Sequence, residues 1–444
     1  MDAEERTETL QYRPSFRMTR GEEEIASGED ARVELDVDHF TVGGGFGRAH
    51  VIAYRNVAGL ESRDYRVRVP LVTGEELTFY HLGHDHDGFV RDLNDRRNEG
   101  IIRDLLMYES VVVEGVRADY VLEDGDGTHR GSGQLRLYGS ALVLSSQGEG
   151  VVRIPYGLIS DVSPGDYSLA VTTEYGTSIT FSGMGKAHRY FVDEFSKILD
   201  GLAARTAEEL DEMLPELGPQ AIGRLTPHLR DGRAGRRSEL ESLAPGIWDA
   251  FRRRMAELEC LEYYDFLRSL SHTEEAYLGT KRGLMGNPED HYVWFLMPFL
   301  GPAPGPGNAV AMEVAGGEGG RATYFFQLVG RDAYPDLSGE ALEDAVEEAV
   351  AEINRCMMSI NFRREPIYLP ADRLGEPRYA RYAAAVASMP SLRHLRDRFI
   401  GRVIHRSTEG WQRDVLDLLT FNTSTRDDSA RWRGDPEPEG GSAC

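Results

Sequence analysis

Residues 52–90 read IAYRNVAGLESRDYRVRVPLVTGEELTFYHLGHDHDGFV, and residues 154–192 read IPYGLISDVSPGDYSLAVTTEYGTSITFSGMGKAHRYFV. Aligned without a gap, at a spacing of 102 residues, the two stretches agree at twelve positions. Chance would give about two or three agreements at ordinary residue frequencies. The identical pairs are Ile52/Ile154, Tyr54/Tyr156, Asp64/Asp166, Tyr65/Tyr167, Val69/Val171, Gly74/Gly176, Thr78/Thr180, Phe79/Phe181, Gly83/Gly185, His86/His188, Phe89/Phe191 and Val90/Val192. This repeat predicts that one folded module occurs twice in the chain.

The pattern within each copy predicts short strands followed by one helix. Residues 33–37 alternate apolar with acidic side chains, and residues 65–69 alternate apolar with arginine side chains, as half-buried strands do. Gly74 and Gly176 lie between strand-like runs, where glycine supplies the positive φ of a tight hairpin. Near position 86 the apolar period changes from 2 to 3.6, which indicates that a helix begins there.

A sheet of this size cannot bury both faces by itself, so the helix is expected to cover an open face or end. This order of elements resembles the pleckstrin-homology-like (PH-like) superfold, in which a bent sheet is plugged by a C-terminal helix, and in particular the prokaryotic PH-like and GRAM-like domains. The resemblance covers residues 33–202 and rests on element order. It implies an α+β protein with two tandem PH-like modules, each closed by a helix, before a mixed helical and β C-terminal region.

The glycine-rich stretch Gly43–Gly47 is not expected to bind phosphate. It joins two predicted strands, whereas a phosphate loop opens a helix and carries a Lys followed by Ser or Thr. PH domains that bind phosphoinositides place basic residues around this loop. Here Arg48 stands alone and the equivalent residues 145–150 carry no positive charge, so phosphoinositide binding is not carried over from the resemblance.

The rest of the chain is divided by composition and periodicity. Prolines break residues 206–271 into helices, apolar runs make residues 276–329 β-rich, and Ser338 caps a further helix. Strands followed by a helix leave open a third, diverged module over residues 276–360. The expected division is a polar N-terminal segment 1–30, a first module 31–106, a connector 107–132, a second module 133–205, a helical region 206–271, an α+β C-terminal domain 272–422 and a disordered tail 423–444.

The composition limits the cellular compartments and the classes of partner that fit this chain. The net charge is −24, and 47 of the 50 basic residues are Arg, so nucleic acid and anionic lipid are repelled unless a basic patch exists. A halophile with a salt-rich cytoplasm and a GC-rich genome explain this composition about equally well. No apolar run is long enough to span a membrane, and residues 1–6 do not begin a signal peptide. Three cysteines without paired spacing fit a reducing cytoplasm, which is the expected location.

A cluster of potential metal ligands lies where the first helix begins. His81, His84, Asp85 and His86 are followed by Asp87, which is also a candidate N-cap. Imidazole and carboxylate groups together bind zinc and other divalent metals. The second copy shares only the histidine at position 188, and contiguous ligands lack the spacing of most metal sites. A solvated loop with a helix cap is therefore the favoured interpretation, with a metal site as the alternative.

An arginine-rich segment is the second candidate site. Residues 363–413 contain eleven Arg and five Asp or Glu, and an apolar stripe leaves Arg393, Arg396, Arg402 and Arg406 largely on the other side. These four arginines are candidates for binding an acidic partner or nucleic acid. The favoured alternative is that the arginines of this segment pair with the protein's own carboxylates.

The function favoured by the sequence is a non-enzymatic cytoplasmic adaptor that binds protein segments, through strand addition at an exposed sheet edge. By architecture alone, tandem PH-like pairs also resemble the front half of archaeal chemotaxis adaptor proteins. Motifs of nucleophilic, metal and nucleotide enzymes are absent, and no cofactor or catalytic residue is predicted. Cys260 and Cys356 are expected to be packing residues. Two alternatives stay open: an enzyme or small-ligand site in residues 260–421, lined by Trp294, Tyr324 and Phe326, and nucleic-acid binding through residues 363–413.

Overall fold

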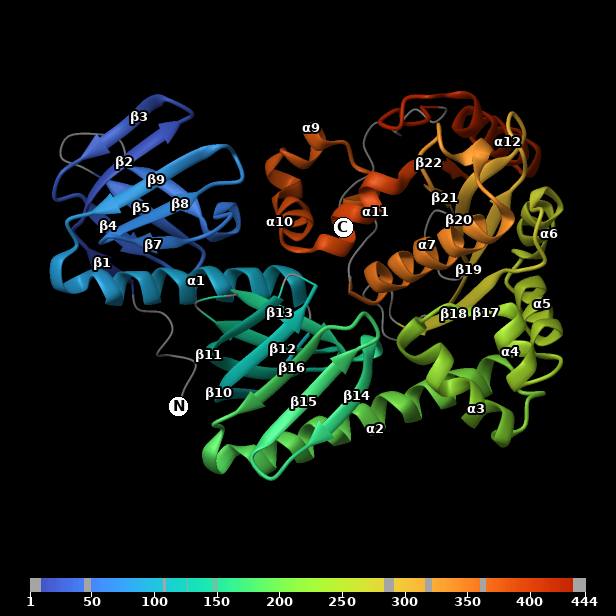
Figure 1. Ribbon diagram of the computed structural model, residues 1–444, viewed down its shortest axis with the longest axis horizontal. Helices are drawn as coiled ribbons and strands as arrows, with labels where there is room; N and C mark the ends of the chain where they lie inside the picture. Colours follow the sequence, from blue (N-terminus) through green and yellow to red (C-terminus); the bar gives the residue numbers. More distant parts are fainter. Residues whose placement is uncertain are drawn as a thin grey trace. The chain divides into compact units, whose positions relative to one another are not determined.

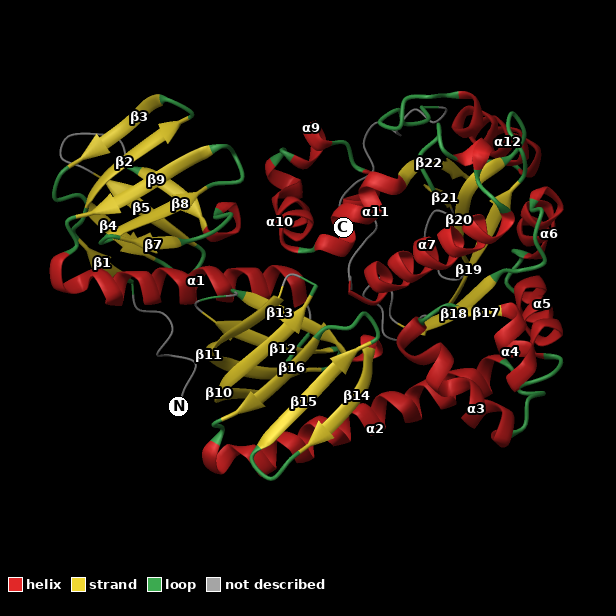
Figure 2. Cartoon of the chain, in the orientation of Figure 1, coloured by secondary structure: helices red, strands yellow, loops and turns green. Residues whose placement is uncertain are grey.

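The computed structural model describes residues 9–43, 49–106, 109–125, 127–146, 148, 150–282, 291–315, 322–359 and 365–433. Within these residues the chain is an α+β protein with antiparallel sheets and the helices α1–α12 (Figures 1 and 2). It divides into two compact units. The first contains residues 1–195 and 371–389, and the second contains residues 196–370 and 390–444.

The first copy of the repeat forms two small sheets and one helix. A four-stranded sheet has the order β1-β4-β5-β6, and a five-stranded sheet has the order β3-β2-β9-β8-β7. The helix α1 (His86–Leu106) follows β9. The strands are β1 (Leu10–Tyr12), β2 (Ser15–Arg20), β3 (Glu23–Gly28), β4 (Arg32–Leu35), β5 (His39–Gly43), β6 (His50–Ala53), β7 (Glu61–Arg63), β8 (Arg66–Pro70) and β9 (Glu75–Tyr80). The sequence predicts only a polar segment before residue 31, whereas β1–β3 belong to these sheets.

The second copy forms a single seven-stranded sheet of order β13-β12-β11-β10-β16-β15-β14, followed by the helix α2 (His188–Met213). Its strands are β10 (Val111–Asp124), β11 (Gly127–Tyr138), β12 (Ala141–Ser146), β13 (Val151–Pro155), β14 (Ile159–Pro164), β15 (Ser168–Thr173) and β16 (Ser178–Ser182). The sequence predicts a connector over residues 107–132. The structure instead makes residues 111–124 the central strand, paired with both β11 and β16.

The N-terminal strands of the two copies bend at the same place by different means. In the first copy Pro14 separates β1, which pairs with β4, from β2, which pairs with β9. Proline has no N–H and interrupts a ladder. In the second copy one strand makes both pairings, and its ladder shifts register between Val113 and Val116 around Gly115, which has φ +77°. Glycine adopts this backbone conformation at little cost, so the strand bends without ending.

Equivalent elements of the two copies lie 102 residues apart. The short 3-10 helices η2 (Tyr54–Asn56) and η4 (Tyr156–Leu158) match, as do η3 (Gly83–Asp85) and η5 (Gly185–Ala187), and α1 and α2 begin at His86 and His188. The cores match as well. Tyr54 and Tyr156 are each 1% exposed, and Phe89 and Phe191 are fully buried. The same side chains therefore fill the same places in both copies.

Helix α1 also joins the two copies. Its first half supplies Phe89 and Leu93 to the core of the first copy. Further along, the Asn94 and Asn98 side chains donate hydrogen bonds to the buried Ser146 carbonyl of β12, at 3.2 and 3.0 Å. Two more contacts strengthen the junction: Glu99 forms a bidentate ion pair with the buried Arg136, and Ile102 packs on Tyr138 and Val143. Figure 1 shows α1 between the two sets of strands.

The helix α10 (Ala380–Ser388) returns to the first unit from late in the sequence. It packs against α1 and η2, and Arg381 lies 3.7 Å from the buried Asp104 carboxylate of α1, which also faces Arg55 at 3.3 Å. The neighbouring α9 (Ala371–Leu374) belongs to the same unit. The sequence predicts one C-terminal domain over residues 272–422, whereas residues 371–389 are part of the first unit.

The second unit is built around a six-stranded sheet of order β17-β18-β19-β20-β21-β22. Odd-numbered side chains of β19, such as Phe295, join the core with α3–α6 and α12, while Trp294 and Leu296 face the side of α7. This order differs from that of the two modules, because the last strand follows the helices α7–α11. The elements are α3 (Pro219–Leu229), β17 (Gly235–Arg236), α4 (Arg237–Leu243), α5 (Ile247–Glu257), α6 (Leu261–Leu270), β18 (Tyr277–Arg282), β19 (His291–Leu300), β20 (Gly307–Ala315), β21 (Ala322–Gln327), α7 (Gly339–Ser359), α8 (Glu365–Tyr368), α11 (Pro390–Arg398), β22 (Phe399–Ile404) and α12 (Thr408–Ser424).

The residues after α12 are packed on the second unit as far as Trp432, although the sequence predicts a disordered tail from residue 423. Arg331 is buried, and its guanidinium donates to the carbonyls of Asp427 and Ala430. The Asp428 carboxylate accepts from the Arg331 backbone N–H at 2.9 Å and from Gln327 at 2.7 Å. The Trp432 N–H donates to the Ile400 carbonyl at the open edge of β22, so this segment protects that edge.

Candidate functional site

The structure separates the side chains of the predicted metal cluster. His81 is exposed and lies 3.3 Å from the Ser15 hydroxyl, while His84 and Asp85 are exposed in η3. His86 begins α1, and its Nδ1 lies 2.9 Å from the Asp87 carboxylate. Successive residues of a helical turn point about 100° apart, so neighbours in sequence diverge. Among the described residues, no three His, Cys, Asp or Glu side chains come together as metal ligands.

Two of the four predicted arginines are used inside the second unit. The Arg396 guanidinium donates to the backbone carbonyls of Pro366 and of Leu369, the latter at 2.7 Å, and so caps α8. Burial lowers the pKa of Arg396. The Arg402 guanidinium lies 3.9 Å from the ring centre of Tyr368, which is a close cation–π contact.

The other two predicted arginines, Arg393 and Arg406, are exposed. Between them in the sequence, Arg398 forms ion pairs with Glu348 at 2.6 Å and Glu352 at 3.3 Å, both on α7. The structure therefore uses Arg396 and Arg402 in contacts within the second unit and leaves Arg393 and Arg406 exposed. Residues 363 and 364, which belong to the same arginine-rich segment, lie outside the described residues.

The aromatic residues proposed to line a ligand site are core residues. Trp294 is buried, and its Nε1 donates to the Gly232 carbonyl at 2.8 Å. Tyr324 packs against Tyr368, and Phe326 packs against Phe399. Cys260 and Cys356 are also buried, and burial raises the pKa of the Cys356 thiol. A buried thiol with a raised pKa is a poor nucleophile.

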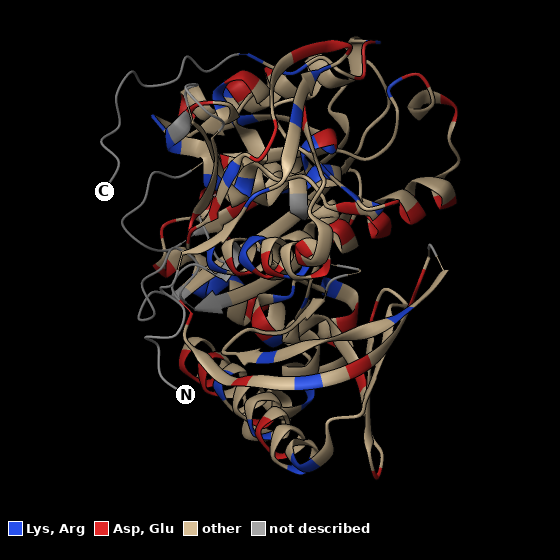
Figure 3. Ribbon diagram, turned by 90° about the vertical axis from the view of Figure 1, so that its left-hand side faces the viewer, with Lys and Arg blue, Asp and Glu red and all other residues tan. Residues whose placement is uncertain are grey.

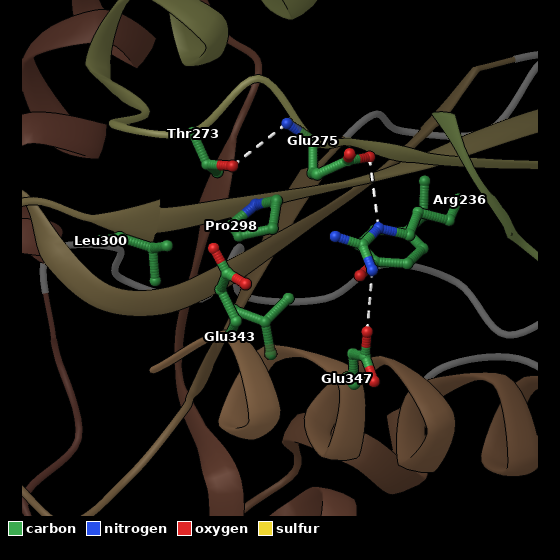
Figure 4. A pocket seen from close by; sticks show the side chains of 9 residues that line it. Arg236, Thr273, Glu275, Pro298, Leu300, Glu343 and Glu347 are labelled. Carbon is green, nitrogen blue, oxygen red and sulfur yellow. Dashed lines mark hydrogen bonds and ion pairs between the residues drawn. The ribbon is translucent and has the colours of Figure 1, made fainter. Parts of the chain in front are cut away.

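A small pocket opens between α7 and the β17–β19 side of the sheet (Figure 4). Its volume of about 20 Å³ is enough for a water molecule. Arg236 lies between the carboxylates of Glu275 at 3.4 Å and Glu347 at 2.8 Å. Glu343 and Tyr277 also line the pocket, and burial raises the pKa of the Tyr277 hydroxyl to about 12. The pocket is too small for an ordinary metabolite.

A buried polar cluster in the second unit was not predicted. Glu313 on β20 is 1% exposed, and its carboxylate accepts from the Thr323 hydroxyl on β21. His405, directly after β22, places Nε2 at 3.1 Å from both the Glu313 carboxylate and the Thr323 hydroxyl. The Trp411 Nε1 of α12 donates to the Thr323 hydroxyl at 2.8 Å. The cluster therefore ties three strands and a helix together.

The geometry of this cluster is not that of a nucleophile and its base. In a Ser–His–Asp arrangement the two imidazole nitrogens contact different partners, the nucleophile and the acid. Here one nitrogen of His405 contacts both Thr323 and Glu313, and His405 Nδ1 is buried without a hydrogen-bond partner in the described chain. The ring centre of Tyr263 lies 4.2 Å from that of His405, so Tyr263 packs directly against the cluster. The arrangement is suited to holding the sheet and α12 together.

Comparisons with known proteins leave the family open. Neither a protein family model nor a curated protein matches the chain. Among solved structures, the Spt16D Pob3N heterodimer is a weak neighbour: the match covers 37% of this chain and 82% of that chain, with 11% sequence identity and a TM-score of 0.16. A TM-score this low does not establish a shared fold. No helix in the described part of the chain has both the length and the apolar character needed to cross a bilayer.

Proposed function

We propose that the protein is a non-enzymatic cytoplasmic adaptor, in which two PH-like modules present binding surfaces for protein partners. The support for PH-like modules is the seven-stranded order β13-β12-β11-β10-β16-β15-β14 followed directly by α2, whose Phe191 and Phe195 are fully buried. Two sheet segments meeting along one bent strand and plugged by a C-terminal helix are the arrangement that defines the superfold.

The observation that carries the proposal is an open sheet edge in the first module. Strand β7 is the last strand of its sheet, and all three of its residues are exposed. Arg63 lies opposite Arg66 across a two-residue turn. In such a hairpin the two residues that flank the turn exchange backbone hydrogen bonds. Ser62, the residue before Arg63 on β7, therefore directs its backbone N–H and C=O away from β8. These groups are positioned to pair with an added strand.

The equivalent edge in the second module is blocked by a proline. The Gly165 N–H donates to the Ser168 carbonyl at 2.8 Å, so the residue before Gly165 faces outward. That residue is Pro164, which is equivalent to Ser62 and has no N–H to donate. Proline on an edge strand prevents strand addition. We therefore assign partner binding by strand addition to β7 and not to β14.

The test exchanges these two residues between the modules. An affinity-tagged full-length chain is used to capture partners from native lysate at native salt. We expect the wild type to recover a partner, Ser62→Pro to lose it and Pro164→Ser to keep it, with circular dichroism showing that both variants are folded. Recovery of no partner by the wild type would count against an adaptor, and equal recovery by Ser62→Pro would exclude β7 as the binding edge.

A further inference from the structure

The two modules share one exposed feature that the fold does not require. Tyr65 and Tyr167 lie at the tips of the β7–β8 and β14–β15 hairpins, and each side chain is 80% exposed. The preceding Asp64 and Asp166 are identical and exposed too. Most other identical pairs of the repeat are buried, or are glycines in turns, and so have structural reasons to match. A packing argument does not account for the Asp–Tyr pairs.

The geometry of the turns does not account for them either. In the first module Asp64 and Tyr65 have φ of +52° and +58°, a left-handed conformation that disfavours an aromatic side chain and favours Asn-Gly. In the second module Asp166 and Tyr167 do not have positive φ. The same two residues therefore occur in two different backbone conformations. In the first module that conformation is one that an aromatic residue disfavours. Their retention points to a contact made outside the chain.

A third shared residue supports each tip. The ring of His86 lies 5.6 Å from the ring of Tyr65 in an edge-to-face contact. In the second module His188 Nε2 lies 3.2 Å from the Ser168 carbonyl, next to Tyr167. Both histidines begin the helix of their module. Each tip is therefore a highly exposed tyrosine ring preceded by an exposed carboxylate, and in the first module the His86 imidazole lies against the ring.

We propose that these two Asp–Tyr tips recognise arginine side chains of a basic segment in a partner protein. A guanidinium can stack on a tyrosine ring while it pairs with a carboxylate, and arginine does this better than lysine because its planar group stacks. The chain carries a net charge of −24, which attracts a basic partner. This inference rests on the proposed adaptor function and names the chemistry of its partner.

The second unit contains an internal example of the same recognition. Arg252 lies 5.5 Å from the ring centre of Tyr264, and its two terminal nitrogens pair with Asp265 at 2.7 and 3.2 Å. There too the tyrosine and the aspartate are adjacent in sequence, in the order Tyr-Asp. One guanidinium can therefore engage both side chains of such a pair.

The residues that flank the two tips differ, and this difference predicts which tip binds arginine more strongly. Arg63 and Arg66 flank the first tip, and Arg63 lies 3.8 Å from the Asp64 carboxylate, with both side chains highly exposed. Gly165 and Ser168 flank the second tip and carry no charge. The flanking arginines compete with an incoming guanidinium. We therefore expect Tyr167 to contribute more to arginine binding than Tyr65.

The test compares two peptides of equal charge. Fluorescently labelled Gly-Arg-Gly-Arg-Gly-Arg-Gly and its lysine counterpart are titrated into the full-length protein by anisotropy at several salt concentrations. General attraction to an acidic protein affects both peptides alike, so the ratio of their affinities isolates stacking. We expect the wild type to prefer the arginine peptide by about two- to fivefold. Tyr167→Ala should remove most of that preference, Tyr65→Ala a smaller part, and Tyr167→Phe should retain it because the ring is kept.

Tyr190→Ala serves as the matched control, since Tyr190 is also an exposed tyrosine of the second module, at 55% exposure. Equal affinity of the wild type for both peptides would overturn the inference, as would an unchanged ratio in the Tyr65→Ala/Tyr167→Ala double variant or an equal loss in Tyr190→Ala. In the lysate capture, a partner lost by the double variant and kept by Tyr190→Ala supports the inference. A partner kept by the double variant overturns it while leaving the adaptor function standing.

Discussion

At the scale of single residues, Arg331 shows how one side chain holds a segment distant in sequence. Its guanidinium lies over the ring of Phe421, donates to Asn422 at 3.1 Å, and reaches two backbone carbonyls beyond α12. A buried guanidinium is costly unless its donors are satisfied. Here the donors are satisfied by the C-terminal segment itself, so the packing of Arg331 and the order of that segment depend on each other.

Arg331→Met is therefore expected to release residues 427–433 and to lower the free energy of unfolding of the second unit by about 2–3 kcal/mol, because carbonyls that bind a charged donor lose it. Hydrogen exchange at Ala430 and Trp432, together with urea unfolding, measures the change. Arg426→Met, at an exposed neighbouring position, is the control. Unchanged exchange at Trp432 in Arg331→Met would show that other contacts hold the segment.

Asp104 should make the stability of the first unit depend on pH. Burial raises the pKa of this carboxyl above its ordinary value of 3.8, and the nearby Arg55 and Arg381 offset part of that effect. A group whose pKa is higher in the folded state stabilises the fold when protonated, so stability falls as the pH rises from about 4 through the raised pKa. Asp104→Asn should flatten this part of the profile, measured by urea unfolding between pH 4 and 7. Equal slopes in the two proteins would contradict the assignment.

The sequence predicted the positions of residues correctly within the repeat, where two copies could be aligned. It did not predict contacts between segments that are distant in sequence. The buried positions of Tyr54, Phe89 and their equivalents followed from alignment of the two copies. The Glu313–His405 contact joins residues 92 positions apart, and neither residue stands in a motif. For the dense run from His81 to Asp87, a solvated loop with a helix cap was favoured over a metal site, because contiguous ligands lack the spacing of most metal sites; in the structure, adjacent side chains on the helical turn point in different directions.

At the scale of elements, α1 serves both modules. A helix that closes one sheet needs only one apolar face, but α1 also carries buried amides toward β12. The sequence gives no sign that these amides are buried, because a single sequence does not reveal what the second face of a helix contacts. The strands β1–β3, and the central place of β10 in its sheet, were not predicted for a related reason. They lie outside the identical part of the repeat, and Pro14 and Gly115 bend them differently.

Removing the two amides with Asn94→Ala/Asn98→Ala should weaken the junction between the modules. The Ser146 carbonyl would lose its two side-chain donors in a buried place, so we expect a loss of about 1–3 kcal/mol in the free energy of unfolding. Thermal and urea unfolding measure the loss, and Asp95→Ala on the same helix is the control. A double variant as stable as the control would show that the bond to Ser146 contributes nothing.

At the scale of the whole molecule, the chain has a large excess of acidic residues. Acidic and basic residues are interspersed along the ribbon (Figure 3), but the net charge is −24. Helix α7 concentrates them in one exposed stripe of Glu340, Glu343, Asp344, Glu347 and Glu348. Glu347 and Glu348 pair with Arg236 and Arg398. Like charges three and four residues apart destabilise a helix, and salt screens that repulsion.

Raising potassium chloride from 0.1 to 2 M is accordingly expected to raise the melting temperature, and Glu343→Gln/Asp344→Asn should raise it at 0.1 M and reduce the gain from salt. Calorimetry on the full-length chain is the measurement. Arginine pairs such as Arg236–Glu347 are weakened by salt as well, so a melting temperature that falls with salt would mean that attraction outweighs repulsion.

The α+β class and the presence of several antiparallel sheets followed from periodicity, but the division into units did not. The predicted C-terminal domain loses residues 371–389 to the first unit, where α10 packs on α1. Such a return of the chain leaves no trace in local composition, because an amphipathic helix looks the same whichever surface it covers. Long-range packing of this kind needs coordinates.

The single helix shared by both modules also bears on how strongly a partner with two arginines could be held. Because α1 packs in the core of the first module and also bonds to β12 of the second, a partner bound at one hairpin tip would find the other at a set spacing. Binding at the second tip would then cost little additional conformational entropy, so two weak contacts would give a higher overall affinity. A partner whose arginines were spaced wrongly would gain nothing, so this rigidity would select partners by distance as much as by chemistry.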